Sequence, residues 1–402
     1  PGAEEGIVAI VAPAAAAAAP MVGRVMKLKE VYIVCQMLGA GRAREMACEP
    51  SNLTMKLMPW AGIAALISST EMVASASDTT AATKSALLPP STIIEVDPLR
   101  GRGYCFLPLP VETRLPVHVN GYFELSSNRR DIWFGDDMAG VGQKRSQWNQ
   151  CLLADVVAPV YARLLSTAAR HCGNTPRFLS LWPTTSPTEP WDLVTQGLFK
   201  IIQRNHQLKI FHSPGRSGGT GDDDGVWVSA VDAVLAPSAP HAPSASEGER
   251  ALLLRVAEVL LLANVPIVWL PPQLCSALLD SGACTQSLTP EWTRNFVRTK
   301  TGRMARQFVD APAAATLLSF CLSDVANLKE RDFADIDGLP LIPSRMGSVG
   351  CIRVGEQREE SPLENFYLCE TPLEIAIMAR APHCVVGGGG GSRCCSRQSP
   401  VL

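Results

Sequence analysis

The chain has 402 residues, of which 47% are hydrophobic and 18% are charged, and its formal net charge at pH 7 is −2. This length and apolar content predict two or three domains with a sizeable core, although low-complexity stretches reduce the folded part of the chain. The near-neutral charge provides no electrostatic reason to expect nucleic acid or an anionic membrane as a partner.

The cysteines and the start of the chain indicate where the protein works. The 13 cysteines are odd in number, scattered, and free of Cys-x-x-Cys pairs. We therefore expect reduced thiols in a cytoplasmic protein, without disulfides or a zinc site. Residues 6–23 are alanine-rich, interrupted by Pro13 and Pro20 and without a basic leader, so neither a signal peptide nor a membrane span is predicted. Because the first residue is Pro1 and not Met, we expect a piece of a longer protein.

Three segments precede the most informative part of the chain. Residues 30–38 form an apolar run that predicts a short strand. Residues 56–68 fit either a buried strand leading into a short helix or a helix with Pro59 near its start. Residues 72–90, rich in Ser, Ala and Thr, predict a surface loop.

Residues 105–133 carry the clearest pattern. Prolines at 108, 110 and 116 place the first apolar runs at strand edges or starts, because proline cannot donate to a strand ladder. From residue 117 to 125 every second residue is apolar or glycine, which predicts a half-buried strand. The polar sequence Ser-Ser-Asn-Arg-Arg-Asp at 126–131 then predicts a turn.

The rest of the chain mixes helices with short strands. Ser146 is expected to cap a helix that runs to Leu165, with a kink or break at Pro159. Thr289 and Pro290 have the N-cap and first-turn signature of another helix. The other expected helices are 191–205, 250–263, 273–280 and 313–325, and the other expected strands are 208–211, 226–235, 265–270, 338–343 and 351–354.

This mixture predicts an α+β fold with short mixed sheets, packed helices, low-complexity loops and disordered termini. The expected divisions are a disordered leader (1–26), a middle segment with the arginine-containing turn (27–212), Gly/Asp and Pro/Ala/Ser loops (213–248), a second helix-and-strand segment (249–367) and a disordered tail (368–402). The loops at 213–248 fit a domain boundary and an insertion equally well.

The candidate site residues are Ser127, Asn128, Arg129 and Arg130 in the turn, with His118 in the preceding strand. Adjacent guanidinium groups beside Ser and Asn donors suit a phosphate or a carboxylate. In the favoured, structural interpretation the arginines bind carboxylates or carbonyls of the chain itself and Asn128 fixes the turn. In the functional interpretation one arginine reaches an anion, such as a nucleotide phosphate on a neighbouring domain, and stabilises developing charge there. His118 is either a packed core histidine or a neighbour of the arginine pair.

Two other features are weaker. Gly215-Arg216-Ser217-Gly218-Gly219 matches the nucleophile-elbow pattern, but an aspartate-rich stretch and a strand follow it where a helix is required. A flexible loop is therefore expected, and a serine hydrolase using Ser217 is the least favoured alternative. Basic residues between Arg294 and Arg306 predict a solvated helix face, since aromatics and overall positive charge are missing.

Several blocks resemble the sacsin repeat of the sacsin family, including its plant and algal members. The most specific block is CFLPLP at 105–110 with LPVHVNGYFELSSNRRDIW at 115–133. The other blocks, in the family's order, are GRAREMA (41–47), PWAGIAA (59–65), WNQCLLADVVAPVY (148–161), VWVSAVDAV (226–234), PPQLCSALL (271–279) and GLPLIPSRMGSVG (338–350).

The resemblance implies a chaperone or co-chaperone in protein quality control, with client proteins or other chaperones as partners. Repeats of that family open with a Bergerat-fold ATPase-like domain, shared with large heat-shock chaperones and gyrase. This chain lacks the expected magnesium-holding Asn helix and Asp-x-Gly-x-Gly segment, and residues 335–338 do not fit the latter. We therefore expect no cofactor and no enzymatic activity in this chain, with ATP and magnesium held by an upstream domain. By analogy Arg129 or Arg130 would contact that nucleotide's terminal phosphate. Arg114 and the insertions at 213–225 and 236–248 depart from the family pattern.

Overall fold

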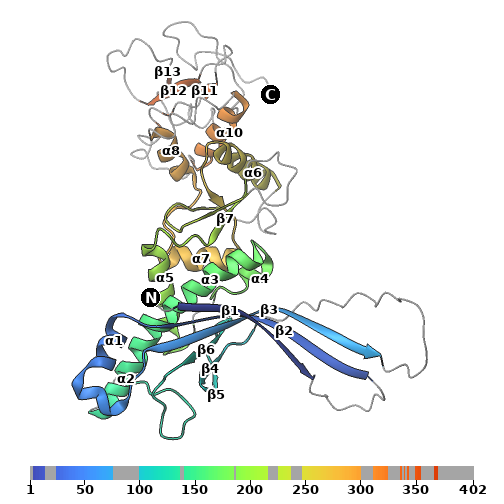
Figure 1. Ribbon diagram of the computed structural model, residues 1–402. Helices are drawn as coiled ribbons and strands as arrows, with labels where there is room; N and C mark the ends of the chain where they lie inside the picture. The colour runs from blue at the N-terminus through green and yellow to red at the C-terminus, as the bar shows by residue number, and fades with distance from the viewer. Residues whose placement is uncertain are drawn as a thin grey trace. The chain divides into compact units, whose positions relative to one another are not determined.

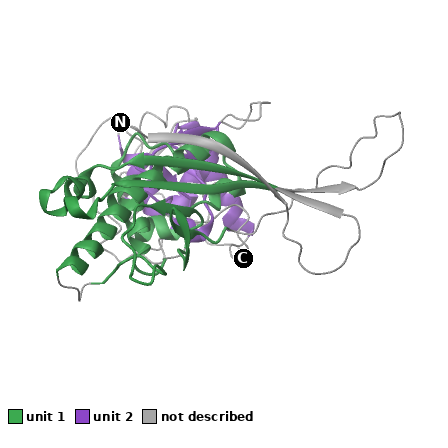
Figure 2. Ribbon diagram, turned by 60° about the horizontal axis from the view of Figure 1, so that its bottom comes forward, with its two compact units in different colours: residues 1–210, 276–283 green, residues 211–275, 284–402 purple. Residues whose placement is uncertain are grey.

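The structure is a computed structural model that describes residues 3–13, 24–75, 99–135, 140–184, 187–215, 225–236, 247–299 and 311–324, with 336, 339, 342–343, 349–354 and 366–369. The chain forms two compact units, residues 1–210 with 276–283 (unit 1) and residues 211–275 with 284–402 (unit 2), coloured separately in Figure 2. Each unit combines helices with short sheets, so the predicted α+β class is confirmed.

Unit 1 is built around a six-stranded sheet with the order β1-β2-β3-β6-β4-β5 (Figure 1). Neighbouring strands are antiparallel except β4 and β6, which are parallel, so the sheet is mixed. The strands are β1 (Ala3–Pro13), β2 (Arg24–Leu38), β3 (Trp60–Ser75), β4 (Arg102–Cys105), β5 (Leu107–Glu112) and β6 (His118–Gly121).

The first strands differ from the expectation of a disordered leader over residues 1–26. Ala3–Pro13 pairs along its whole length with β2, which begins at Arg24, ahead of the expected start at residue 30. The run between Ile7 and Val11 contains β-branched residues suited to a strand, and Pro13 falls at the strand end, where its missing N–H is tolerated. The prediction of a disordered leader rested on composition alone, by which this apolar run is of low complexity.

The segment with two alternatives, residues 56–68, is a strand from Trp60 onward, and the helix does not form. β3 lies between β2 and β6, which supply backbone partners on both sides. Beyond it, the alternation predicted for 117–125 is confirmed, because Val117, Val119 and Phe123 are all buried on one side. The surface loop predicted for 72–90 begins later than expected, since β3 runs to Ser75; residues 76–90 lie outside the described residues.

Helices of unit 1 pack on this sheet. Helix α3 contacts β2 and β3, and α5 packs against α3. The helical elements are α1 (Gly41–Cys48), the 3-10 helix η1 (Pro50–Met55), α2 (Val141–Leu152), the π-helical stretch η2 (Leu153–Val157), α3 (Ala158–Cys172), α4 (Pro176–Leu179) and α5 (Asp192–Arg204).

The interruption expected at Pro159 takes the form of the π-helical stretch η2. Proline has no N–H to donate, and the wider turn accommodates this without ending the helix. The stretch also carries Asp155, whose Oδ2 accepts a hydrogen bond of 3.2 Å from the N–H of Ala43 in the first turn of α1. Gly41, with φ +63°, lets the chain pass this carboxylate, because a Cβ there would lie 3.1 Å from the same oxygen. Asp155 thus satisfies an amide at the start of α1.

The cap predicted at Ser146 is wrong, because α2 begins at Val141. Ser146 is buried inside the helix, where its hydroxyl donates to the carbonyl of Gly135 (3.0 Å) and accepts from the Gly135 N–H (3.2 Å). A tertiary contact therefore explains this serine.

Gly101 lies where a side chain has no room. Its N–H donates to Leu115 O (2.9 Å) and its carbonyl accepts from Thr113 N (2.9 Å), and a Cβ would press on the carbonyls of Leu115 and Val117. We expect Gly101→Ala to lower the free energy of unfolding by about 3 kcal/mol, because backbone must move. Urea unfolding is the measurement. Gly248→Ala is the control, since nothing lies within 4 Å of its Cβ position, and equal stability of both variants would contradict the packing argument.

Unit 2 has small sheets and four described helices. The sheets are β7 (Phe211–Ser213) with β8 (Val226–Val228), β9 (Val234–Leu235) with β10 (Ile267–Val268), and β11 (Ile342–Pro343) with β12 (Val349–Val354) and β13 (Phe366–Cys369). The helices are α6 (Glu247–Leu262), α7 (Pro272–Asp280, whose last residues belong to unit 1), α8 (Pro290–Arg298) and α10 (Ala311–Cys321). The N-cap predicted at Thr289 is confirmed, since its hydroxyl accepts from Trp292 N (3.1 Å).

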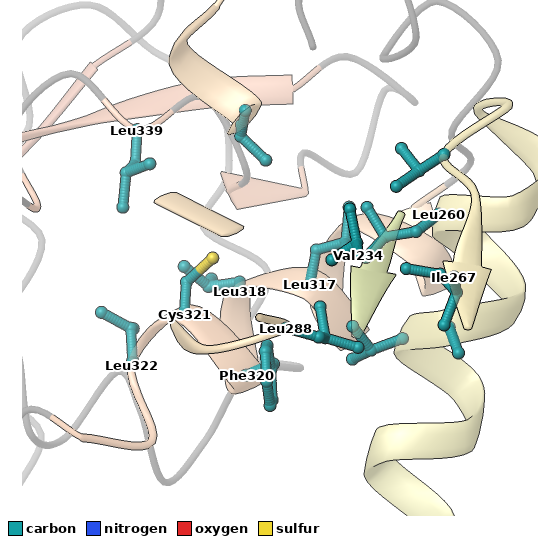
Figure 3. Packing of buried hydrophobic residues seen from close by; sticks show 14 of the residues in the cluster. Val234, Leu260, Ile267, Leu288, Leu317, Leu318, Phe320, Cys321, Leu322 and Leu339 are labelled. Carbon is teal, nitrogen blue, oxygen red and sulfur yellow. The ribbon is translucent and has the colours of Figure 1, made fainter. Parts of the chain in front are cut away.

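The core of unit 2 gathers apolar side chains from α6, α10 and the β9–β10 pair (Figure 3). Arg294, expected on a solvated face, is only 1% exposed. Its Nη1 donates to Cys321 O (2.6 Å) and Asp324 Oδ1 (2.7 Å), and its Nη2 donates to Asp324 Oδ2 (3.1 Å). The sequence pattern shows where the charged residues are, but it does not show which of them will be buried against a carboxylate far along the chain.

β8 and β9 lie where a strand was predicted at 226–235, between the two predicted loops, and most of the loop residues (216–224 and 237–246) lie outside the described residues. The chain passes from unit 1 to unit 2 at residue 210, close to the predicted segment boundary. The tail predicted from 368 starts inside β13, and its remainder lies outside the described residues.

One described helix, Val141–Cys172 taken through the π-helical stretch, is long and apolar enough by composition to cross a membrane. Of its most apolar 18-residue window, 67% is buried inside the structure, and a core helix meets the same criterion.

Candidate functional site

The predicted turn is a closed loop held by its own polar groups. Ser126 N donates to Asp131 O (2.9 Å) and Arg129 N donates to Ser126 O (2.8 Å). Asn128 Oδ1 accepts from the Ser126 hydroxyl (2.7 Å) and from Arg130 N (3.0 Å). The role predicted for Asn128 in fixing the turn therefore agrees with the geometry. We call residues 126–131 the arginine turn.

Helix α2 clamps the base of the arginine turn. Asn149 is fully buried and makes three hydrogen bonds to it: Oδ1 accepts from Glu124 N (2.9 Å), and Nδ2 donates to Glu124 O and Trp133 O (both 2.8 Å). Trp148 Nε1 donates to Tyr122 O (2.9 Å). One amide side chain thus substitutes for a strand partner on both sides of the hairpin.

Arg145, on the same helix, adds a charged contact. Its Nε lies 3.2 Å from Glu124 Oε2, and its guanidinium lies 5.5 Å from the ring centre of Trp133. The Glu124 carboxylate is therefore compensated by Arg145 and does not face the arginine turn uncompensated.

The two turn arginines lack, among the described residues, the partners that the structural interpretation requires. Arg129 and Arg130 are both exposed, as is Ser127, and neither guanidinium makes a hydrogen bond or ion pair within the described part of the chain. Arg129 has φ +54°, an uncommon backbone for a residue with a side chain. Among the described residues, the turn thus presents two exposed guanidinium groups without a partner on a rigid base.

His118 is not joined to the arginine turn by any interaction among the described residues. Its Nδ1 accepts from Arg102 N (3.1 Å), and its ring lies against Tyr32 (centroids 6.3 Å apart) and edge-on to Tyr104 (5.6 Å). Burial, followed by the charge of Arg102, lowers the pKa of His118, while Glu30 opposes this. The packed-histidine alternative therefore describes this residue.

The lowered pKa of His118 makes stability depend on pH. The unfolded chain binds a proton below pH 6.5 more readily than the folded one, so this contribution is present above that pH and is lost as the pH falls through the folded pKa. We expect the wild type to lose more unfolding free energy between pH 7.5 and pH 5 than His118→Asn, whose Oδ1 replaces the Nδ1 acceptor. Urea unfolding at both pH values measures this, and parallel losses in the two proteins would refute it.

Other chemistries find little support in the described residues. No group of three or more His, Cys, Asp or Glu side chains there could hold a metal. Burial raises the pKa of several thiols and so disfavours the thiolate, namely Cys105, Cys151, Cys172, Cys275, Cys284 and Cys321. Ser217 lies outside the described residues, between β7 and β8, and the second of these is a strand where a nucleophile elbow has a helix.

The residues that sequence reasoning missed are Arg145 and Asn149. Both lie on the predicted helix that contains Trp148, whose residues were expected to serve packing. A polar Asn next to a buried Trp was the available signal, but the hairpin that needs its amide lies 16–25 residues away.

Comparison with known proteins gives one partial match. A stretch of 64 residues, 16% of this chain, is 52% identical to sacsin of Homo sapiens, and it covers 1% of that protein's length. No family model matches the chain, and no solved structure matches it. The similarity supports a sacsin-like region within an α+β protein.

Proposed function

We propose that this chain is a sacsin-like, chaperone-related segment that acts in cytoplasmic protein quality control and is non-catalytic by itself. Its partners are client proteins or other chaperones, without nucleic acid or membrane. The 52% identity to human sacsin is the observation that carries the proposal. The exposed arginine turn on its rigid base provides a surface through which such a segment can bind.

The proposal is tested by aggregation of a heat-denatured protein. Light scattering of citrate synthase at 43 °C is followed with and without the chain, with and without ATP and magnesium. We expect the chain to suppress scattering in proportion to its concentration and equally in both conditions. Unchanged scattering at a tenfold excess over citrate synthase would refute a chaperone role for the chain alone.

A second function is favoured by the exposed guanidinium groups of Arg129 and Arg130, which have no partner in the part of the chain that the structure describes. In this proposal the arginine turn contacts the terminal phosphate of ATP bound, with magnesium, to an upstream Bergerat-fold domain of the same polypeptide. Arginine suits a phosphate because its planar donors bind it in a bidentate manner.

Calorimetry with ATP and magnesium tests this arrangement, on this chain and on a longer version that includes an upstream domain. We expect binding by the longer version alone, weakened in Arg130→Gln and unchanged in Arg114→Gln, an exposed arginine outside the turn. Binding by this chain alone would place the nucleotide elsewhere, and equal binding by both variants would exclude the arginine turn.

A further inference from the structure

Unit 1 exposes a second surface next to the arginine turn. Four of its large apolar side chains are strongly exposed: Leu107 (75%), Phe106 (61%), Leu38 (55%) and Met58 (44%). Isolated exposed apolar residues are common, whereas a contiguous group marks a binding surface. We call the two of these that share a row of the sheet, Phe106 and Leu38, together with the half-buried Trp60 and Tyr122, the aromatic patch.

The patch is contiguous because its residues occupy one level of the sheet. Leu38 on β2 is paired with Trp60 on β3, and Tyr122 N donates to Trp60 O (3.3 Å). The Phe106 ring stacks on Trp60, with centroids 5.7 Å apart and planes 4° from parallel, and meets Tyr122 edge-on at 5.9 Å. Four segments of the chain thus present their side chains side by side.

The backbone of Phe106 has an energetically unfavourable conformation. It connects β4 and β5 with φ +60°, where glycine is the ordinary residue. Asn120 Oδ1 accepts a hydrogen bond of 3.0 Å from Phe106 N and so fixes the conformation. Strained residues persist where surroundings over-determine them, and they concentrate at functional sites.

The patch and the arginine turn share one support. The chain runs from Tyr122 straight into the turn, and residues 122–125 cover roughly 10 Å if extended. Helix α2 holds both ends of this connection, through Trp148 on Tyr122 O and Asn149 on Glu124. Their spacing is therefore set by packing and not by a free loop.

The charges between the two surfaces are unequal. Glu124 is compensated by Arg145, and Asp131 Oδ1 accepts from Ile132 N at 2.7 Å. Arg129 and Arg130 have no such partner among the described residues. Among the described residues of the turn, two arginines thus stand against the single carboxylate of Asp131, and this positive charge beside an apolar surface is complementary to apolar side chains followed by carboxylates.

We propose that the aromatic patch and the arginine turn together bind an extended segment of a partner protein, in which apolar side chains precede a run of Asp or Glu. The apolar residues pack on Phe106 and Trp60, and the carboxylates pair with the turn arginines. This inference rests on the proposed chaperone-related function and gives its binding surface a chemistry.

Fluorescence anisotropy tests the proposal with a labelled 12-residue peptide that has four Leu or Ile residues in its first half and four Glu in its second. We expect Phe106→Gly to weaken binding about tenfold, because it removes the ring on which the peptide packs. Glycine at this position also relieves the backbone strain. The double variant Arg129→Gln, Arg130→Gln should weaken binding to a similar extent, as should 0.5 M NaCl.

Matched controls separate these effects from general ones. Arg114→Gln changes another exposed arginine with positive φ (+55°), and Leu262→Ala changes another exposed leucine (56%). Both should bind as the wild type does. A peptide with Gln in place of Glu should bind about tenfold more weakly, since the charge pairs are lost.

Three results would overturn the proposal. The first is equal binding of the Glu and Gln peptides, and the second is no difference between the turn variants and Arg114→Gln. The third is displacement of the peptide by ATP and magnesium through the turn arginines, which assigns the turn to a nucleotide. If the chain still suppresses citrate synthase aggregation in any of these cases, the chaperone proposal stands and only this inference fails.

Discussion

Asn149→Leu is expected to lower the free energy of unfolding by about 3 kcal/mol, because it removes three hydrogen bonds at once. The N–H of Glu124 and the carbonyl of Trp133 lose the amide as their partner, and the carbonyl of Glu124 keeps only its bond from Trp133 N, while the leucine side chain still fills the site. Urea unfolding followed by tryptophan fluorescence measures the change. Hydrogen exchange should also become faster at residues 124–133, since the clamp on the arginine turn is gone.

Gln147→Leu is the matched control for this substitution. It lies on the same helix, two residues earlier, and its side chain is exposed. We expect a change within about 0.5 kcal/mol for it. If Asn149→Leu and Gln147→Leu were equally stable, the amide would not support the hairpin, and the rigid base assigned to the arginine turn would be wrong.

Asp324→Ala is expected to lower the free energy of unfolding of unit 2 by about 3 kcal/mol, because it leaves the buried Arg294 guanidinium without its carboxylate. The carboxylate is 28% exposed, which allows some water to reach the cation and places the loss at the lower end of values for buried pairs. Thermal and urea unfolding both measure it.

The double variant Arg294→Met, Asp324→Leu decides whether the pair itself stabilises unit 2. We expect it to recover most of the stability lost in Asp324→Ala, because an apolar pair does not need the charge compensated. A double variant as unstable as the single one would mean that losing the hydrogen bond from Arg294 to Cys321 O costs as much as removing the uncompensated charge gains.

The lack of partners for Arg129 and Arg130 among the described residues alters the balance between the two interpretations of the arginine pair. The structural interpretation requires carboxylate or carbonyl partners, and the described residues provide none. Asn128 and Ser126 hold the turn through the backbone, so the guanidinium groups are available to a ligand. Their exposure also means that replacing them should change stability by no more than about 0.5 kcal/mol, which lets binding experiments be interpreted without a folding defect.

The sequence by itself determined the local features with a strong period or a specific end signal. Alternation predicted the burial of Val117, Val119 and Phe123 in and beside β6, and Thr289 with Pro290 marked the start of α8. Pro159 predicted an interruption of the helix, and the polar residues around Asn128 predicted a turn. Each depends on neighbours within a few residues, which is the range over which backbone geometry and side-chain spacing act.

Tertiary structure decided everything that depends on distant partners. Whether residues 60–75 became a strand was settled by β2 and β6 on either side, and the apolar run at 3–13 became β1 because β2 was there to pair with it. Arg294 is buried because Asp324 meets it, Asn149 is structural because its amide bonds both arms of the hairpin, and the turn guanidinium groups are exposed without a hydrogen-bond or ion-pair partner among the described residues. Such pairings bring together residues far apart in the chain, and no local pattern encodes them.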